Sequence, residues 1–146
     1  ENFLEAARYG NFDHRGRNLA EKFWPGALTL VVNRRGDCAL SAEINPFGAT
    51  VALRAPGNEI AIRLLRAFAG PLTAPSANPS GAAAPETAEA AARGLGQAIE
   101  AVLDGGPCPG NESTIVDLTA DTARLLREGA ITGHSIAEAL HPLRLR

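Results

Sequence analysis

Proline and glycine pairs divide the first half of this chain into short segments. They occur at Pro25-Gly26, Pro56-Gly57 and Gly70-Pro71. Proline cannot continue a helix or an inner strand, and glycine adopts the backbone angles of tight turns, so each pair predicts the end of a regular element. This part of the chain must therefore fold as several short elements joined by sharp turns.

The segments between these pairs show the periodicities of helices and strands. Residues 17–24 predict the end of an amphipathic helix, and the apolar, partly β-branched segment 27–32 predicts a buried strand. The segment "TVALR" at 50–54 predicts a second strand. Asn58 is suited to cap the helix that follows. The predicted apolar stripe of that helix consists of Ile60, Ala61, Leu64, Leu65 and Phe68.

The second half continues this mixture of helices and strands. An alanine-rich helix is predicted over residues 87–95, with Thr87 as its cap. Ser135 is followed three residues later by a glutamate, which predicts the capping box of a last short helix. The apolar runs that predict strands are 99–104, 113–118 and 123–127. The sequence therefore predicts a mixed α/β protein.

The composition limits the class of protein. The chain has 146 residues, of which 45% are hydrophobic and 21% are charged, values typical of one soluble globular domain. No apolar run approaches the roughly 18 residues that a membrane-spanning helix needs. The net charge is −2 and the arginines are scattered, which argues against an extended surface for duplex nucleic acid. Cys38 and Cys108 lack the spacing of metal or redox motifs, so two lone thiols indicate a reducing cytoplasm.

Three polar side chains lie at the ends of predicted strands. Arg54 and Arg127 end two of them, and Ser113 begins another. The ends of strands in α/β sheets often face a crevice, and the planar fork of arginine suits carboxylates and phosphates. These residues therefore fit a ligand that carries both groups. The alternative is that each arginine is a solvated or ion-paired surface residue.

The segment "PLTAPSANPSG" at 71–81 is polar and conformationally restricted. Pro75 and Pro79 fix their own φ angles and also restrict the residue before each of them. Ser76 and Asn78 then offer a hydroxyl and an amide from a loop that is stiff before any ligand binds. The alternative is an ordinary surface turn, since turns are rich in these residue types.

Five stretches occur together in an order typical of one family. They are "KFWPGALTLVV", "TVALRAPGN", "PLTAPSANPSG", "VLDGG" with "NESTIVDL", and "LLREGAI". With these motifs, residues 17–131 resemble the YrdC/Sua5 family of threonylcarbamoyl-AMP synthases. The resemblance implies an α/β (α+β) fold: a twisted, mixed, open sheet flanked by helices, YrdC-like (DHBP synthase RibB-like), with a central cavity. It also implies a single YrdC-like domain over residues 1–146.

The resemblance further implies an activity. Members of the family make L-threonylcarbamoyladenylate from L-threonine, bicarbonate or carbon dioxide, and ATP, and they release pyrophosphate. The product feeds a downstream transferase complex that makes the t6A modification of transfer RNAs. Mg²⁺ is expected with the ATP, although no carboxylate cluster in the sequence predicts a dedicated metal site. A cytoplasmic location and no membrane partner are expected.

The family's motifs also imply roles for individual positions. No covalent catalytic residue is implied, because the chemistry consists of aligning the substrates and stabilising charge on the phosphates. The positions that contact ATP are Thr50, Ser76, Asn78 and Arg127. The positions that hold threonine are Arg54, Ala74 and Ser113.

Two features depart from the family pattern. Members begin with a strand and loop that resemble "PTETVYGLG", followed by a K-x-R motif that grips the triphosphate, and neither occurs here. We therefore expect a short YrdC-type form that is truncated before residue 1. Ala84 stands where members commonly have a serine that reaches the nucleotide, and losing one such hydrogen bond costs about 1 kcal/mol.

Two alternative functions stay open. The chain could be a module that binds nucleotide or RNA, including double-stranded RNA or tRNA, without completing the reaction. The net charge of −2 disfavours the RNA version. The chain could instead correspond to the carbamoyl-adenylating domain of hydrogenase-maturation carbamoyltransferases, but the zinc-binding modules that normally accompany that domain do not occur in this sequence.

Overall fold

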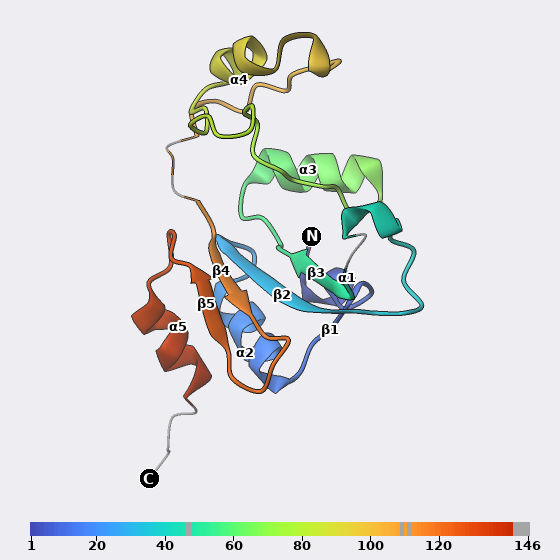
Figure 1. Ribbon diagram of the computed structural model, residues 1–146, viewed down its shortest axis with the longest axis vertical. Helices are drawn as coiled ribbons and strands as arrows, with labels where there is room; N and C mark the ends of the chain where they lie inside the picture. Colours follow the sequence, from blue (N-terminus) through green and yellow to red (C-terminus); the bar gives the residue numbers. More distant parts are fainter. Residues whose placement is uncertain (46–47, 109, 111, 142–146) are drawn as a thin grey trace. The chain divides into compact units, whose positions relative to one another are not determined.

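The computed structural model describes residues 1–45, 48–108, 110 and 112–141, and Figure 1 shows its elements. The chain divides into two compact units. The sheet unit consists of Glu1–Pro71 and Glu112–Arg146, and the second unit consists of Leu72–Asn111. The prediction that residues 1–146 form a single YrdC-like domain stays a prediction.

The sheet unit is built around one mixed sheet. Strand β2 pairs antiparallel with β1 and β3 and parallel with β4, and β4 pairs antiparallel with β5. In the register, Leu30 lies opposite Leu53 of β3, and Leu28 lies opposite Thr114 of β4. The strands are β1 (Gly10–Asn11), β2 (Leu28–Arg34), β3 (Thr50–Leu53), β4 (Thr114–Asp117) and β5 (Arg124–Arg127). The predicted mixed, open sheet is confirmed, and so are four of its predicted strands.

Short helices accompany the sheet, and each longer one begins at a residue whose side chain accepts a backbone N–H. Asp13, Asn58 and Thr132 act in this way in the sheet unit. No helix within the described residues is long and apolar enough to cross a membrane. The helices of the sheet unit are α1 (Phe3–Ala6), α2 (His14–Phe23), η1 (Ala42–Ile44), α3 (Glu59–Phe68) and α5 (Gly133–Leu140).

The predicted cap of the last helix is wrong. Ser135 lies inside α5, and the helix begins one turn earlier. Thr132 has extended backbone angles, and its Oγ1 accepts a hydrogen bond from the Ser135 N–H at 3.2 Å. The cap is therefore the threonine that stands three residues before the predicted one.

The second unit contains α4 (Ala88–Leu95) and the short helix η2 (Gly96–Ala98). The Thr87 Oγ1 accepts a hydrogen bond from the Ala90 N–H at 3.2 Å, so the predicted cap is confirmed. The predicted strand at 99–104 is wrong, because this segment has no regular structure. A strand needs a neighbour with which to form hydrogen bonds, and the described part of this unit contains no strand. The side chain of Leu103 is 65% exposed.

The core of the sheet unit covers one face of the sheet. Alternate residues of β2 point into this core, and α2 and α5 cover it, so both helices lie against the same face (Figure 1). Burying a large aliphatic side chain stabilises a fold by about 1.5–3 kcal/mol. The core residues are Leu19, Ala20, Leu28, Leu30, Val32, Val51, Val116, Leu118 and Ile136.

Helix α3 differs from α2 and α5 in its packing. Its apolar stripe has the predicted spacing, yet none of its residues is buried. Leu64 is 46% exposed and Phe68 is 60% exposed. The pattern therefore predicted the helix correctly. The burial that such a stripe normally indicates does not occur in this helix.

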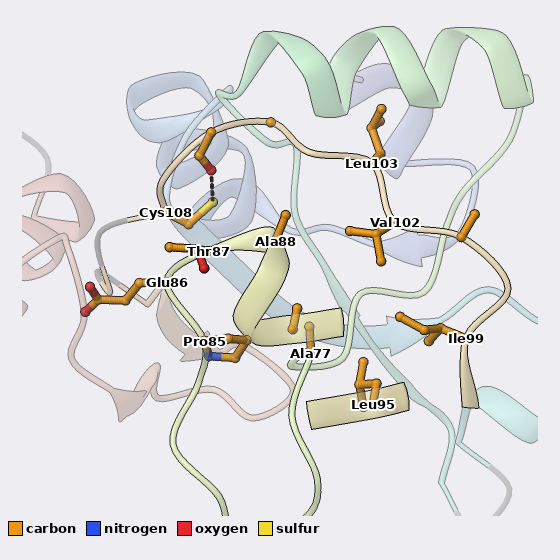
Figure 2. Close-up of a pocket in the computed structure, with 14 residues that line it drawn as sticks. Ala77, Pro85, Glu86, Thr87, Ala88, Leu95, Ile99, Val102, Leu103 and Cys108 are labelled. Carbon is orange, nitrogen blue, oxygen red and sulfur yellow. Dashed lines mark hydrogen bonds between the residues drawn. The ribbon is translucent and has the colours of Figure 1, made fainter. Parts of the chain in front are cut away.

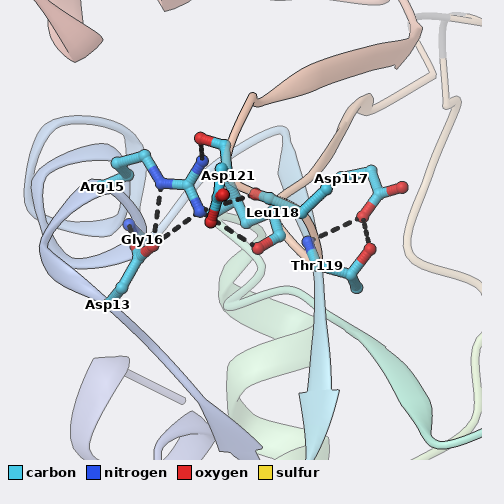
Figure 3. A network of polar contacts seen from close by, with 8 residues as sticks. Asp13, Arg15, Gly16, Asp117, Leu118, Thr119 and Asp121 are labelled. Carbon is cyan, nitrogen blue, oxygen red and sulfur yellow. Dashed lines mark hydrogen bonds and ion pairs between the residues drawn. The ribbon is translucent and has the colours of Figure 1, made fainter.

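An arginine ties the start of α2 to the connection between β4 and β5 (Figure 3). Arg15 forms an ion pair with Asp13 at 2.7 Å, and its guanidinium donates hydrogen bonds to the carbonyls of Leu118, Ala120 and Asp121. Burial alone would raise the pKa of Asp13. The hydrogen bonds from Arg15 and from the Gly16 N–H, together with the charge of Arg15, outweigh this effect and lower the pKa.

A threonine in the core joins the start of β4 to the turn before α5. The Oγ1 of Thr114 donates to the carbonyl of Ile131 at 2.6 Å and accepts from the N–H groups of Gly129 and Ile131, each at 3.0 Å. Thr114 is fully buried, so no water can replace these contacts. This one hydroxyl therefore fixes the path of residues 129–131 beside β4.

We predict that Thr114→Val destabilises the protein by roughly 2–5 kcal/mol, because two N–H groups lose their acceptor inside the core. Thr114→Ser keeps the hydroxyl and removes only a methyl group, so its unfolding free energy should fall by clearly less. Urea unfolding followed by circular dichroism measures both free energies. Equal losses in the two variants would show that the hydroxyl is not the stabilising group.

A second prediction concerns acid stability. A carboxyl group whose pKa is lower in the folded state stabilises the fold above its unfolded pKa, near the ordinary value of 3.8, and this contribution is lost as the pH falls through the folded pKa. Asp13→Asn keeps a capping side chain but does not titrate. The wild type should therefore be more stable than Asp13→Asn at pH 7, and the difference in unfolding free energy should shrink below about pH 4. A difference that keeps its full size at pH 3 would contradict this assignment.

Candidate functional site

The predicted site residues of the sheet unit lie on the face opposite the core. Side chains alternate between the two faces of a strand. On β3, Val51 is buried in the core, so Thr50 and Arg54, one and three residues away, lie on the other face. On β4, Thr114 is buried in the core, which places Ser113 on that other face.

Strand β5 adds Arg127 to the same face, because this residue lies opposite Ile115 in the register. Arg54, Ser113 and Arg127 form what we call the polar cluster. The sequence placed these three residues at strand ends. Arg54 directly follows β3, Ser113 directly precedes β4, and Arg127 ends β5.

The turn after α2 holds Arg54 in position. The Nε of Arg54 donates to the carbonyl of Gly26 at 2.8 Å, and the Gly26 N–H donates to the carbonyl of Ala55 at 2.8 Å. A Cβ on Gly26 would lie 2.3 Å from the carbonyl oxygen of Phe23. The glycine of the "WPG" turn is therefore needed for this close approach, and its carbonyl fixes the arginine stem.

Arg127 is held by the residues that lead into β4. Its Nε donates to the carbonyl of Ser113 at 3.0 Å, and its Nη2 donates to the Ser113 hydroxyl at 3.2 Å. Its Nη1 forms an ion pair with Glu112 at 2.7 Å. A guanidinium has five N–H donors, so Arg127 keeps two for another acceptor. The predicted alternative of an ion-paired arginine thus holds in part for Arg127.

The polar cluster is electropositive at Arg54. Burial lowers the pKa of Arg54, and the nearby positive charge of Arg127 lowers it further. No carboxylate forms an ion pair with Arg54 within residues 1–45, 48–108, 110 and 112–141. Both of its Nη groups are also without hydrogen bonds in this part of the chain. An anion bound beside Arg54 would relieve the repulsion between the two guanidinium groups.

Thr50 lies apart from the polar cluster. The length of β3 separates it from Arg54 by about 13 Å. The Oγ1 of Thr50 accepts a hydrogen bond from the Asn45 side chain at 3.0 Å. Thr50 shares the sheet face of the cluster, but its predicted contact with ATP stays a prediction.

The other predicted positions lie in the second unit. The Asn78 side-chain amide donates to the carbonyls of Pro79 at 3.1 Å and Ala82 at 2.8 Å, which closes a turn. Gly81 lies in this turn and has a φ of +82°, a left-handed backbone conformation that favours glycine. Asn78 therefore stabilises its own loop, and its buried Oδ1 accepts no hydrogen bond from the described residues.

Ala74 and Ser76 are exposed on the loop before this turn, and so is Ala84 after it. The Ser76 hydroxyl makes no hydrogen bond within the described part of the chain. Arg54, Ser113 and Arg127 therefore lie in the sheet unit, whereas Ser76 belongs to the other unit. The ligand contacts of Ala74, Ser76 and Asn78 stay predictions.

The second unit has a hollow of its own, of about 350 Å³ (Figure 2). Its walls are mostly apolar and include side chains of α4 and of the irregular segment 99–106. Ala77 lines it, although the neighbouring Ser76 and Asn78 do not. An apolar wall does not suit a phosphate or a carboxylate, so this hollow offers no alternative to the polar cluster as an anion site.

Nothing in the described residues forms a metal-binding cluster of three or more histidine, cysteine, aspartate or glutamate side chains. The carboxylate next to the polar cluster, that of Glu112, is paired with Arg127. The cluster therefore offers cationic and hydroxyl groups, which suit an anionic ligand.

Sequence reasoning missed three residues that build the site. Gly26 positions Arg54, Glu112 pairs with Arg127, and Thr114 fixes the segment behind them. Each belongs to a motif that was noticed, "FWPGALT" or "NESTIVDL". Their partners lie farther along the chain, so no local sequence pattern predicts these contacts. Only the presence of each residue in a family motif indicates that it matters.

A family model identifies the family of this chain. The model of the Sua5/YciO/YrdC family, described as telomere recombination, matches residues 1–129. The chain belongs to this family. The match begins at the first residue, well before residue 17, where the resemblance in the motifs begins.

Two curated relatives illustrate how similar proteins are named. The threonylcarbamoyl-AMP synthase of Bacillus subtilis is 39% identical over 135 residues, which are 92% of this chain and 39% of that protein. The putative threonylcarbamoyl-AMP synthase of Mycobacterium tuberculosis is 44% identical over 125 residues, which are 85% of this chain and 56% of that protein. The chain thus spans between two fifths and just over half of the length of these relatives.

Solved structures show the same fold. Sua5 of Pyrococcus abyssi, complexed with L-threonine, superposes with a TM-score of 0.89 at 35% identity, covering 95% of this chain and 41% of that one. Escherichia coli YciO superposes with a TM-score of 0.80 at 25% identity, covering 90% of this chain and 65% of that one. The predicted mixed α/β fold with an open sheet flanked by helices is therefore confirmed, and the central cavity stays a prediction.

We predict that Gly129→Ala destabilises the protein by about 1–3 kcal/mol. A Cβ on Gly129 would lie 2.2 Å from the Glu112 carbonyl oxygen and 2.7 Å from the carbonyl carbon of Ser113, so the backbone that holds Arg127 must shift. Gly36→Ala is a matched control, because no heavy atom lies within 4 Å of its Cβ position. Thermal unfolding followed by circular dichroism compares the two, and an unchanged melting temperature for Gly129→Ala would refute the close packing.

Proposed function

We propose that this chain provides the amino-acid and nucleotide sites of an L-threonylcarbamoyladenylate synthase. The enzyme would join L-threonine, bicarbonate or carbon dioxide, and ATP, and release pyrophosphate. One observation carries the proposal: Arg54 presents Nη donors that no described residue occupies, on the sheet face that also carries Ser113 and Arg127. The names of the relatives and the L-threonine complex of the Pyrococcus abyssi structure support the choice of substrate.

Arg54 is proposed to bind the carboxylate of threonine. Its Nε is occupied by Gly26, so the two Nη groups can donate in parallel to the two carboxylate oxygens. The hydroxyl of Ser113 lies beside Arg127 on the same face and can donate to the same carboxylate. Ala74, which has no polar side-chain group, would contribute only backbone groups or packing to the threonine site.

The nucleotide is proposed to lie beside the amino acid. Arg127 keeps two N–H donors for phosphate oxygens, and Thr50, Ser76 and Asn78 would add neutral hydrogen-bonding groups. The amine of threonine adds to carbon dioxide and loses a proton, which gives a carbamate. A carbamate oxygen then attacks the α-phosphorus, the bond from that phosphorus to the bridging oxygen breaks, and pyrophosphate leaves with the electron pair. The protein's task is to align these groups and to stabilise the negative charge.

Mg²⁺ is proposed to arrive with the ATP and to be held mainly by its phosphates. Such an ion neutralises charge on the triphosphate. The donors in the polar cluster are cationic or hydroxyl groups, so the protein residues on this face fit the phosphate oxygens better than they fit the ion. A downstream transferase complex would receive the product for the t6A modification of transfer RNA, and a cytoplasmic location fits this role.

The decisive experiment is incubation of the protein with ATP, L-threonine, bicarbonate and Mg²⁺. We expect pyrophosphate release that depends on threonine, together with the adenylate in the mass spectrum. Binding of ATP and threonine without any product would instead support a module that binds its ligands and does not complete the reaction. Absence of both product and binding would refute the proposal.

A further prediction separates the two ligand sites. Arg54→Ala should weaken L-threonine binding by roughly 10- to 150-fold, the loss of charged hydrogen bonds worth about 1.5–3 kcal/mol, and should change ATP binding far less. Isothermal titration calorimetry measures both dissociation constants. Arg63→Ala is the control, because Arg63 is exposed on α3 and forms no ion pair among the described residues. Equal losses for ATP and threonine would show that the role assigned to Arg54 is wrong.

A further inference from the structure

A hydroxyl on strand β2 contacts the polar cluster. The Oγ1 of Thr29 lies 2.9 Å from the Oγ of Ser113, and either atom can be the donor. Thr29 is half-buried on β2, between the buried Leu28 and Leu30, so it points to the face opposite the core. It lies opposite Ile115 in the parallel register, and Ser113 stands two residues before Ile115 on that face.

The contacts of Ser113 determine what its hydroxyl can do. A hydroxyl has one proton to donate and two lone pairs that accept. Arg127 can only donate, so its Nη2 occupies one lone pair of the Ser113 oxygen. When Thr29 donates as well, both lone pairs are filled, and the Ser113 proton is available to another acceptor. When Ser113 donates to Thr29, the serine instead turns a lone pair toward any ligand.

The charge of the cluster selects between these two arrangements. Arg54 and Arg127 make this face positive, so it favours an anion, and a carboxylate can only accept hydrogen bonds. A serine that donates its proton stabilises the carboxylate, whereas a serine that presents a lone pair repels it. Donation from Thr29 to Ser113 and from Ser113 to the carboxylate forms a chain in which each hydrogen bond strengthens the next.

We propose that Thr29 is a positioning residue, which directs the Ser113 proton toward the carboxylate of the amino-acid substrate. This inference rests on the proposed function, because it needs Ser113 in the threonine site. Two properties make Thr29 suited to the role. Its β-branched side chain restricts χ1 in a strand, and the low exposure of Ser113, 7%, limits the access of water that could replace it.

The test is a double-mutant cycle on threonine affinity. Thr29→Val replaces the hydroxyl by a methyl group, and Thr29→Ser keeps the hydroxyl. We expect Thr29→Val to raise the dissociation constant of L-threonine about fivefold to tenfold and to leave that of ATP within about twofold. Thr29→Ser should recover most of the loss. In a Ser113→Ala background, Thr29→Val should have no further effect, because Thr29 acts through Ser113.

Three results would overturn the inference: unchanged threonine affinity in Thr29→Val, equal losses for threonine and ATP, or the same fold-change with and without Ser113. Circular dichroism checks that each variant is folded, and Thr29→Ala replaces Thr29→Val in the same cycle if the valine variant does not fold. A wild type that binds threonine and forms the adenylate, with any of these results, refutes this inference alone. A wild type that does not bind threonine refutes the proposed function and this inference together.

Discussion

The parallel pairing of β2 with β4 is the contact on which the site depends. It joins segments that are far apart in the chain, and the contact between Thr29 and Ser113 alone spans 84 positions. Once β4 lies beside β2, Thr114 is buried and holds the backbone of residues 129 and 131. The same pairing places Ser113 beside Arg127, since β5 folds back along β4. One pairing therefore supports both the core and the polar cluster.

The alternation of side chains along each strand places the core on one face of the sheet and the polar cluster on the other. On β2, β3 and β4 every second side chain enters the core, where α2 and α5 exclude water. The intervening positions and the strand ends next to them include Thr29, Ser113 and Arg54, whose polar groups would be costly to bury in the core without partners. The alternation thus allows two arginines to lie close together without disturbing the packing beneath them. It also gives the polar cluster a rigid base, because the core residues fix the strands whose other face carries it.

Features that depend on local sequence could be predicted, and features that depend on distant partners could not. Pro25-Gly26 and Asn58 mark a turn and a helix start by their own backbone chemistry, and both lie where expected. The strand-end positions of Arg54 and Arg127 followed from short apolar runs. The carbonyl of Gly26 that holds Arg54, 28 positions away, left no local pattern. Within the described residues, the segment 99–104 has a strand-like pattern but no regular structure, and the stripe of α3 has a core-like pattern although none of its residues is buried.

The sequence left open whether Arg54 and Arg127 are surface residues or ligand-binding groups. The contacts of the two arginines differ in this respect. Arg127 is paired with Glu112 and hydrogen-bonded to Ser113, so part of its charge already has a partner. A triphosphate near this pair would meet the carboxylate as well as the guanidinium, which is a physical reason for a cation to accompany the nucleotide. Arg54 has only the carbonyl of Gly26 as a partner within the described residues, and its pKa is lowered by burial and by Arg127. Arg54 is exposed, so water solvates its guanidinium, but the repulsion from Arg127 is relieved only by an anion, and we therefore propose Arg54 as the stronger anion site of the two.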